Sequence, residues 1–306
     1  MPQLDSATTG YMHPGYARSL SEFGVPTKLK QSGAWFLRRR IPGSAYSDGM
    51  SCYPYLVCQD WSMLASDLEP RCQDLVSFVA TPDPFGDYTL ADLERAFPAR
   101  VLHFKDHHVA DLLTPRHEIV SRRHRKEAER ALRQLDVECH QQPLQFLDDW
   151  MRLFELAVKK FRMTGVRAFS RESFARQLAL PGSFMSLARW HDETVAAHVW
   201  MVHGHAAYAH TAAATDFARQ MGASAALYYV ELEYFADKVR WIDWGGEAGL
   251  AKDGGLSSFK RGWSTEIRPV YFCSRIFNPE RYDELAKARV VSPTNYIPAY
   301  RAGEFN

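Results

Sequence analysis

Apolar residues recur at helical spacing in several long stretches of the chain. The stretches 116–135, 143–162 and 223–238 carry apolar side chains every three or four residues, which predicts three helices. Another helix is expected to begin at Ser170 and to end before Pro181. Shorter helices are expected over 16–23, 89–97 and 257–262.

Between these predicted helices, apolar residues occur in short runs or at every second position, as they do in strands. Short apolar or alternating runs, bounded by Gly, Pro or Asp, predict strands. They lie over 34–41, 75–81, 100–112, 184–190, 195–203, 206–214, 240–244 and 267–274. The three middle strands follow one another directly, so they predict a meander. The order predicts a mixed α/β (α+β) arrangement, a mixed sheet flanked by helices, and not a doubly wound nucleotide-binding fold.

Length and composition set the number and type of domains. The chain has 306 residues, enough for about two domains. We expect an N-terminal α/β half over 1–112 and a second domain over 113–306. Hydrophobic residues make up 46% and charged residues 24%, which is typical of globular proteins. The five cysteines are widely spaced and suggest neither a disulfide framework nor a zinc site.

The charge balance and the hydropathy of the chain argue against some classes of binding partner. Lys and Arg number 37 and Asp and Glu 36, a net charge of +1, which argues against a protein covered with basic charge for nucleic acid. No run of about 18 apolar residues is present, so no membrane span is expected. The N-terminal residues lack the pattern of a signal peptide, and the expected location is the cytoplasm.

The segment Arg219-Gln220-Met221-Gly222-Ala223-Ser224 lies between a predicted strand and a predicted helix. A glycine with small neighbours lets a ligand approach the backbone, and the free N–H groups of a first helical turn favour an anion. A pyrophosphate or phosphopantetheine arm would suit this place. An ordinary turn containing a glycine is the alternative.

A second segment follows the strand over 240–244. It ends in Gly245-Gly246, which permits a sharp departure of the backbone, and it continues to Phe259-Lys260-Arg261-Gly262-Trp263. The ammonium of Lys260 could stabilise a developing thiolate, alkoxide or phosphate charge. A solvated lysine on a surface helix is the alternative.

The run 116–285 resembles the Fem-like and BioF2-like (CelD-like) acyltransferases of the GNAT superfamily. The resemblance rests on the order and spacing of several short motifs, none of them specific alone. They are Arg122-Arg123-His124-Arg125-Lys126, Phe161-Arg162-Met163-Thr164-Gly165 with Phe169-Ser170, Tyr208-Ala209-His210, Met221-Gly222-Ala223-Ser224, Asp243-Trp244-Gly245-Gly246 and Phe259-Lys260-Arg261-Gly262-Trp263.

This resemblance implies a GNAT-like mixed sheet that is splayed in the middle to admit an acyl donor, and a smaller GNAT-like half in the N-terminal region. It implies transfer of an acyl group to an amine. Arg219, the segment 221–224, Phe259 and Trp263 would bind the donor, and Lys260 would match the lysine of the Fem-type Phe-Lys pair. Ser224 departs from the Gly or Ala of acetyl-CoA-binding relatives.

Amine acylation needs a group that accepts a proton. His210 is the best single candidate, because it shares a strand face with Tyr208 and Ala212 and precedes the donor segment. A hydrogen-bonded core histidine is the alternative. Asp243, at the end of the next strand, could orient His210 or act as the base itself.

Three more histidines lie close together in the sequence. The spacing of His198, His203 and His205 admits a metal site, but their apolar neighbours favour packed strands and no fourth ligand is evident. No metal is expected.

The stretch Arg116–Arg133 is strongly basic. Seven cationic residues against three glutamates give it a local charge of +4. A solvated helix face with Glu–Arg pairs is the favoured interpretation. Contact with the phosphates of RNA or of CoA is the other.

These observations lead to an N-acyltransferase as the main hypothesis. The donor would be an acyl thioester, either acyl-CoA or an acyl carrier protein, and the acceptor a primary amine of a small molecule or a peptide. The amine would attack the thioester carbonyl directly. Two alternatives stay open: a Fem-like ligase that uses aminoacyl-tRNA, and a GNAT-like module that binds without catalysis.

Overall fold

The computed structural model describes residues 8–246, 255–289 and 294–304. The chain forms two compact units, each assembled from three segments. Unit 1 comprises Met1–His13, Lys105–Arg162 and Ser170–Pro269. Unit 2 comprises Pro14–Phe104, Met163–Phe169 and Val270–Asn306. The boundary expected between residues 112 and 113 stays a prediction about domains.

Unit 2 is built on strands in the order β1-β2-β3-β4-β11. Their bounds are β1 (Val25–Lys28), β2 (Trp35–Arg40), β3 (Ser47–Ser51), β4 (Leu75–Ala80) and β11 (Glu266–Ile276). β3 and β4 are parallel, and the other neighbours are antiparallel. The helices are α1 (Pro14–Ser19), α2 (Leu64–Arg71), α3 (Leu90–Ala96) and α11 (Pro279–Arg289). A core of Phe36, Phe78 and Phe97 lies between the strands and α2 and α3.

Unit 1 contains strands in the order β5-β10-β9-β8-β7-β6. They are β5 (Arg100–Asp111), β6 (Asp136–His140), β7 (Ser183–Trp190), β8 (Glu193–His203), β9 (Ala206–Ala214) and β10 (Trp241–Asp243). The helices are α4 (Arg116–Ile119), α5 (Arg122–Ala131), α6 (Leu147–Phe161), α7 (Arg171–Leu178), α8 (Asp216–Gln220), α9 (Ala223–Phe235) and α10 (Gly255–Arg261).

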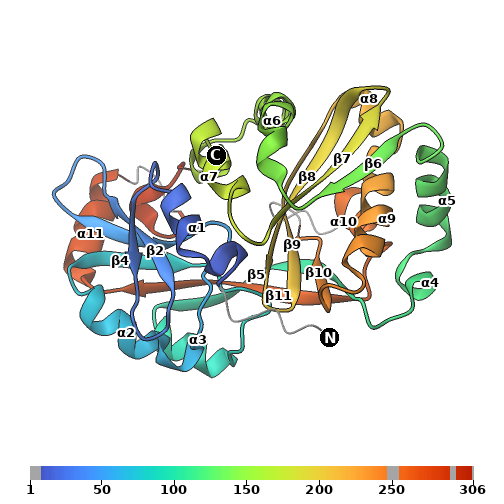
Figure 1. Cartoon of the computed structure of the whole chain (residues 1–306). Coiled ribbons are helices and arrows are strands. Elements are labelled where there is room, and N and C mark those ends of the chain that lie inside the picture. The colour runs from blue at the N-terminus through green and yellow to red at the C-terminus, as the bar shows by residue number, and fades with distance from the viewer. Residues whose placement is uncertain (1–7, 247–254, 290–293, 305–306) are drawn as a thin grey trace. The chain divides into compact units, whose positions relative to one another are not determined.

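Helices cover both faces of the unit 1 strands. α6 packs on β8 and β9 from one side, while α9 packs on β6, β7 and β8 from the other, with α5 beside α9 (Figure 1). Trp200 of β8 is fully buried and contacts Phe235 of α9 and Trp244 after β10. Removing a side chain of this size from a core costs about 3 to 5 kcal/mol, so this packing holds α9 firmly on the strands.

Most predicted elements are present, and the expected mixed α/β class is confirmed. The helix that was predicted over 116–135 is wrong as one element, because it breaks into α4 and α5. Val120 is extended at φ −96° and ψ 119°, and the Ser121 side chain caps α5 by accepting from the His124 N–H. The sequence analysis also missed β1, β3, β6, α2, α8 and α11.

Within the described ranges, no helix has both the length and the apolar character needed to cross a membrane.

Candidate active site

β9 and β10 separate after a short parallel contact. Trp241–Asp243 pair with Ala206–Tyr208, and β9 then runs on to Ala214 while β10 has ended. β8 follows β9 over its whole length on the other side. The second half of β9 is therefore paired with β8 and not with β10, which gives the sheet an opening beside residues 209–214.

His210 lies at this opening, on an irregularity of β9. Val199 pairs with Thr211 and Trp200 pairs with Ala209, so His210 is an extra residue in the ladder. Such a bulge changes the direction in which a side chain points.

Both ring nitrogens of His210 are engaged. Nε2 is 3.0 Å from Gln177 Oε1, which only accepts, so Nε2 carries the proton. Nδ1 then accepts from the Tyr11 hydroxyl, 2.9 Å away. Burial lowers the pKa of His210 to about 3. The imidazole is therefore neutral and held in one orientation at neutral pH.

Asp243, at the end of β10, is buried in a charged environment. His107 Nδ1 of β5 lies 2.9 Å from Oδ2, and the Gly245 N–H donates to Oδ1 at 2.7 Å. Burial raises the pKa of Asp243, but His107, the Gly245 N–H and Lys260 outweigh it, so the pKa is lowered. Burial lowers the pKa of His107 despite the attraction of Asp243. The pair is an anionic carboxylate with a neutral histidine.

Lys260 of α10 is buried, with an exposed fraction of 7%, and so is not a solvated surface lysine. Its Nζ donates to the Gly246 carbonyl at 3.1 Å. Lys260 influences the pKa values of both Asp243 and His107, and Lys105 acts on the same two groups. The end of β10 thus gathers two ammonium groups, a carboxylate and an imidazole.

Gly246 is required where it stands. A Cβ at this position would lie 2.6 Å from the Asp106 carbonyl oxygen and 3.0 Å from His107 Cδ2. No side chain fits against backbone at that distance. The Gly245-Gly246 pair therefore lets the chain pass close to β5 beside His107, the histidine that pairs with Asp243.

An aromatic wall lies beside this charged group. Tyr228 of α9 stacks on Trp244 with ring centroids 4.0 Å apart, and it meets Phe259 and Trp263 edge-on. Trp263 is fully buried, and its carbonyl accepts from Trp244 Nε1. Burial, Glu231 and Asp243 raise the pKa of Tyr228, so its hydroxyl keeps its proton.

The first turn of α9 is the place where the sequence analysis expects an anion to bind. Gly222 precedes the helix in the left-handed conformation, at φ +80°. The N–H groups of Ala223 and Ser224 belong to a first helical turn, which has no helical acceptors. Met221 packs with the buried alanines of this turn. The geometry suits an anion, as the sequence pattern predicts.

The side chain of Arg219 forms an ion pair with Asp216. Its Nε and Nη2 lie 3.1 and 2.6 Å from Asp216 Oδ1, which also accepts from Lys160 Nζ at 2.6 Å. Side-chain hydrogen bonds from these two cations lower the pKa of Asp216 to about 2. Arg219 is thus paired within its own helix, while its role as a donor contact stays a prediction.

The three histidines of the metal interpretation are dispersed. His198 and His203 are five residues apart on β8, so they point to opposite faces. His203 stacks on Tyr208, and His205 is exposed in the turn that follows β8. Among the residues that the structure describes, no group of three or more His, Cys, Asp or Glu could hold a metal ion.

His198 belongs to a second buried pair, which the sequence analysis missed. Glu231 Oε1 accepts from His198 Nδ1 at 2.9 Å, from Trp200 Nε1 at 3.0 Å and from the Ser186 hydroxyl. Glu231 is fully buried, and Oε2 has no hydrogen-bond partner among the described residues. Glu231 is one of two acidic residues, with Glu233, in the otherwise apolar helix α9, and an acidic residue in such a helix is the signal that could have revealed it.

His107 and Tyr11 are the other residues that the sequence analysis missed. Tyr11 lies in a short 3-10 turn (Gly10–Met12) within a segment that the polar pattern did not connect to the site. Its ring meets Tyr208, His203 and His210 edge-on. His107 lies on β5, outside the range that carries the resemblance.

The favoured interpretation of the basic helix predicted Glu–Arg pairs, but α5 forms none. No ion pair within 4 Å involves its cations or its glutamates in the described part of the chain. Those residues are Arg122, Arg123, Arg125, Lys126, Glu127, Glu129 and Arg130. Arg133, just beyond the helix, also forms no ion pair with the described residues. Six of these residues, all except Arg122 and Arg125, line a shallow surface groove.

The strand opening, the bulge and the helix that begins at Gly222 belong to a fold that this chain shares with several solved structures. Among solved structures, FemX superposes with a TM-score of 0.65 at 15% identity, over 88% of this chain and 92% of that chain. The C-terminal domain (DUF2156) of a protein described as a lysylphosphatidylglycerol synthetase from Agrobacterium fabrum gives a TM-score of 0.63 at 14% identity, over 91% of both chains.

L-PGS from Bacillus licheniformis gives a TM-score of 0.60 at 13% identity, over 89% of this chain and 94% of that chain. No family model and no curated protein matches the sequence. At these identities the likeness establishes the fold, and the expected Fem-like GNAT fold is confirmed.

Proposed function

We propose that the protein is an N-acyltransferase that moves an acyl group from a thioester to a primary amine. One observation carries the proposal: the sheet opens between β9 and β10, with His210 at the opening and the Asp243–Lys260 group where β10 ends. An acyl carbonyl in this opening would meet the edge of β9 that faces away from β8 on one side and fixed positive charge on the other.

The donor would place its phosphate end at the first turn of α9. The N–H groups of Ala223 and Ser224 suit a pyrophosphate or the phosphate of a phosphopantetheine arm. Phe259 and Trp263, assigned to the donor by the resemblance, lie in the aromatic wall. Trp263 is fully buried, so it would support the site by packing, while Phe259 is only partly buried.

In the chemical step the amine nitrogen attacks the thioester carbonyl carbon. A C–N bond forms, the C–S bond breaks, the sulfur leaves as a thiolate and one amine proton goes to a base. Lys260 stabilises the negative charge that develops, and Asp243 holds His107 and the Gly245 turn in place. His210 Nδ1 accepts from the Tyr11 hydroxyl and so orients that hydroxyl, while the amine proton leaves to solvent water, because a pKa of about 3 makes this imidazole too weak a base to hold it.

A donor screen tests this function. The purified protein is incubated with CoA thioesters of graded acyl length and a set of primary amines, and products are detected by mass spectrometry. Lys260→Met is expected to lower kcat/KM by about 100-fold or more, because it removes a fixed charge from the transition state. Arg261→Met, on the exposed side of the same helix, is the matched control and should retain activity. Equal turnover by both variants would remove Lys260 from the site.

A second candidate is transfer of an aminoacyl group from tRNA to an amine. The similarity of the fold to FemX favours it. RNase separates the two candidates, because a reaction that runs on a purified thioester after RNase treatment does not depend on tRNA.

A further inference from the structure

The exposed side of α5 presents a row of positive charges that nothing in the described structure neutralises. With 100° between successive residues, five cations fall within about a quarter of the helix circumference. They are Arg122, Arg123, Lys126, Arg130 and Arg133. We refer to these five residues as the α5 stripe. All five are exposed.

The stripe carries a cost in the folded protein. Arg122, Lys126 and Arg130 stand four residues apart, so neighbouring positive charges repel one another by about 0.2 to 0.5 kcal/mol per pair. Glu129 is four residues from Arg133, a spacing that permits an ion pair, yet none forms. On α6 and α8, by contrast, Lys160 and Arg219 both reach Asp216. The unpaired stripe points to an anionic partner.

The stripe lies next to the proposed donor site. The opposite face of α5 packs on the first turns of α9, through Ala128, Ala131 and Ala223 (Figure 1). A methyl group on Gly222 would lie 3.5 Å from Ala131 Cβ and 3.8 Å from Glu127 Cγ. A partner that docks on the stripe is thus beside the helix turn that would receive the donor's phosphate.

Charge distribution favours a small acidic protein over RNA. Residues 122–133 carry +4, while the whole chain carries +1, so the rest of the chain is net negative. The stripe is about 15 Å long, the length of one short helix. Glu127 and Glu129 flank it and would repel a phosphate backbone. The excess of positive charge is thus confined to the stripe, which matches the length of one acidic helix better than that of an extended polyanion.

We propose that the α5 stripe is the docking surface for an acidic acyl carrier protein, whose phosphopantetheine arm enters at Gly222–Ser224. This inference rests on the proposed function and names the form of its thioester donor. Electrostatic docking of this kind acts mainly on association and is weakened by salt.

The experiment compares two donors that carry the same acyl group. Octanoyl-CoA and an octanoyl-loaded acidic acyl carrier protein are supplied to the wild-type protein and to the triple variant R123E/K126E/R130E. We expect the variant to lose about 30-fold or more in kcat/KM with the carrier protein, chiefly through KM, and less than threefold with octanoyl-CoA. Raising the salt concentration should weaken the wild-type reaction with the carrier protein and not that with octanoyl-CoA.

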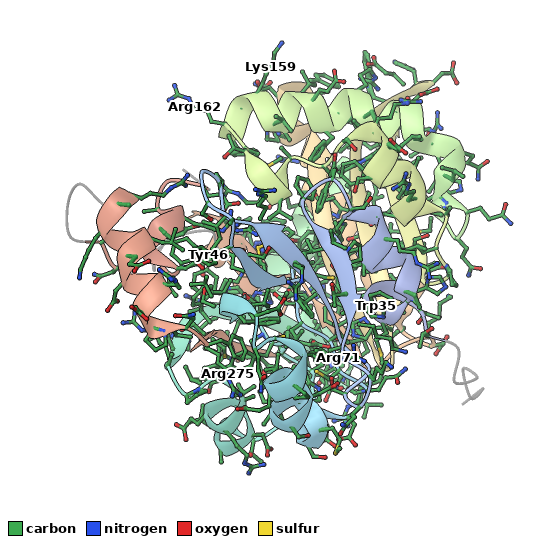
Figure 2. The ribbon with its side chains drawn as sticks, turned by 90° about the vertical axis from the view of Figure 1, so that its left-hand side faces the viewer. Trp35, Tyr46, Arg71, Lys159, Arg162 and Arg275 are labelled. Carbon is green, nitrogen blue, oxygen red and sulfur yellow. The ribbon has the colours of Figure 1, made fainter. Side chains whose placement is uncertain are left out.

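The control variant is K30E/R71E/K159E, which makes the same change in net charge at exposed cations that form no ion pair. Lys159 points outward at the end of α6, and Arg71 ends α2 (Figure 2). Both donors should keep their wild-type kcat/KM with this control. The neutral variant R123Q/K126Q/R130Q replaces the charge reversal if melting shows that the latter does not fold.

Binding separates failure of this inference from failure of the proposed function. Fluorescence anisotropy with labelled, phosphopantetheine-bearing carrier protein measures docking without turnover. Binding that the stripe variant loses and the control keeps supports the docking surface even if no amine is acylated. The inference is overturned if the carrier protein does not bind, or if the stripe variant loses kcat/KM equally with both donors. It is also overturned if bulk tRNA, and not the carrier protein, binds in a way that depends on the stripe.

Discussion

Two histidine–carboxylate pairs are buried in unit 1, and their surroundings differ in kind. Asp243 pairs with His107 where β10 ends, beside Lys260 and Lys105. Glu231 pairs with His198 beneath α9, among Trp200, Tyr228 and other rings. The first pair sits in a field of fixed positive charge, and the second sits in an apolar core.

This difference indicates what each pair does. A carboxylate near two ammonium groups sets the electrostatic potential at the end of a strand, which is useful where charge develops in a reaction. A carboxylate that gathers three donors on one oxygen connects α9 to β7 and β8. We therefore expect loss of the first pair to affect turnover and loss of the second to affect stability.

The largest effects come from neutralising each carboxylate. Asp243→Asn is expected to lower kcat/KM by about 100- to 1000-fold, because the field around Lys260 and His107 changes. Glu231→Ala is expected to lower the free energy of unfolding by about 3 to 5 kcal/mol, since it leaves buried donors unpaired. Turnover per folded molecule of Glu231→Ala should stay within about threefold of wild type.

Urea unfolding and thioester assays on both variants provide the test. Glu231→Gln serves as the mild control, because its amide oxygen can still accept from His198. If Asp243→Asn unfolds as easily as Glu231→Ala and both keep their turnover, the two pairs do not differ in role and the comparison fails.

A smaller effect is expected when a methyl group is added beside the Asp243–His107 pair and both residues of the pair are kept. Gly246→Ala places a methyl group 2.6 Å from the Asp106 carbonyl oxygen, so the backbone beside His107 must move. We expect a loss of about 1 to 3 kcal/mol in unfolding free energy and about tenfold in kcat/KM. Gly255→Ala is the matched control, because a Cβ there meets no atom of the described residues within 4 Å.

Sequence reasoning located Asp243 of the first pair, and it singled out His198 of the second only as a possible metal ligand. Asp243 and Lys260 stand in motifs that the GNAT resemblance carries, whereas His107 reaches Asp243 only through the antiparallel pairing of β5 with β10, 136 residues apart in the chain. Local patterns do not report such pairings. Glu231 was overlooked because the two glutamates of α9, Glu231 and Glu233, do not alter the apolar pattern that predicts the helix.

Local patterns also did not predict where the helix after residue 116 breaks, or how His210 is held. The spacing of apolar residues continues through Val120 and Ser121, so one helix was expected, although the Ser121 cap begins a new one. His210 was placed on the correct strand face, but the bulge and the bond to Tyr11 come from tertiary packing. These contacts make His210 a neutral, oriented imidazole, with a pKa far below the neutral range in which a histidine usually titrates.

The smallest effect that we predict concerns His210, whose ring nitrogens bond to the Tyr11 hydroxyl and to the Gln177 amide oxygen. Burial lowers its pKa to about 3 from 6.5, so the unfolded chain binds a proton at higher pH than the folded one. Stability from this group is complete above about pH 6.5 and is lost as the pH falls toward 3.

Between pH 7.5 and pH 5.0 the wild-type protein should therefore lose about 1 to 2 kcal/mol more unfolding free energy than His210→Gln. Urea titrations at the two pH values measure this difference, and it isolates His210 because the other buried histidines titrate alike in both proteins. His117→Gln, at an exposed position, should follow the wild type. Parallel losses in the wild type and in His210→Gln would mean that His210 is protonated in the folded protein near neutral pH, and it would then regain the basicity expected of a catalytic base.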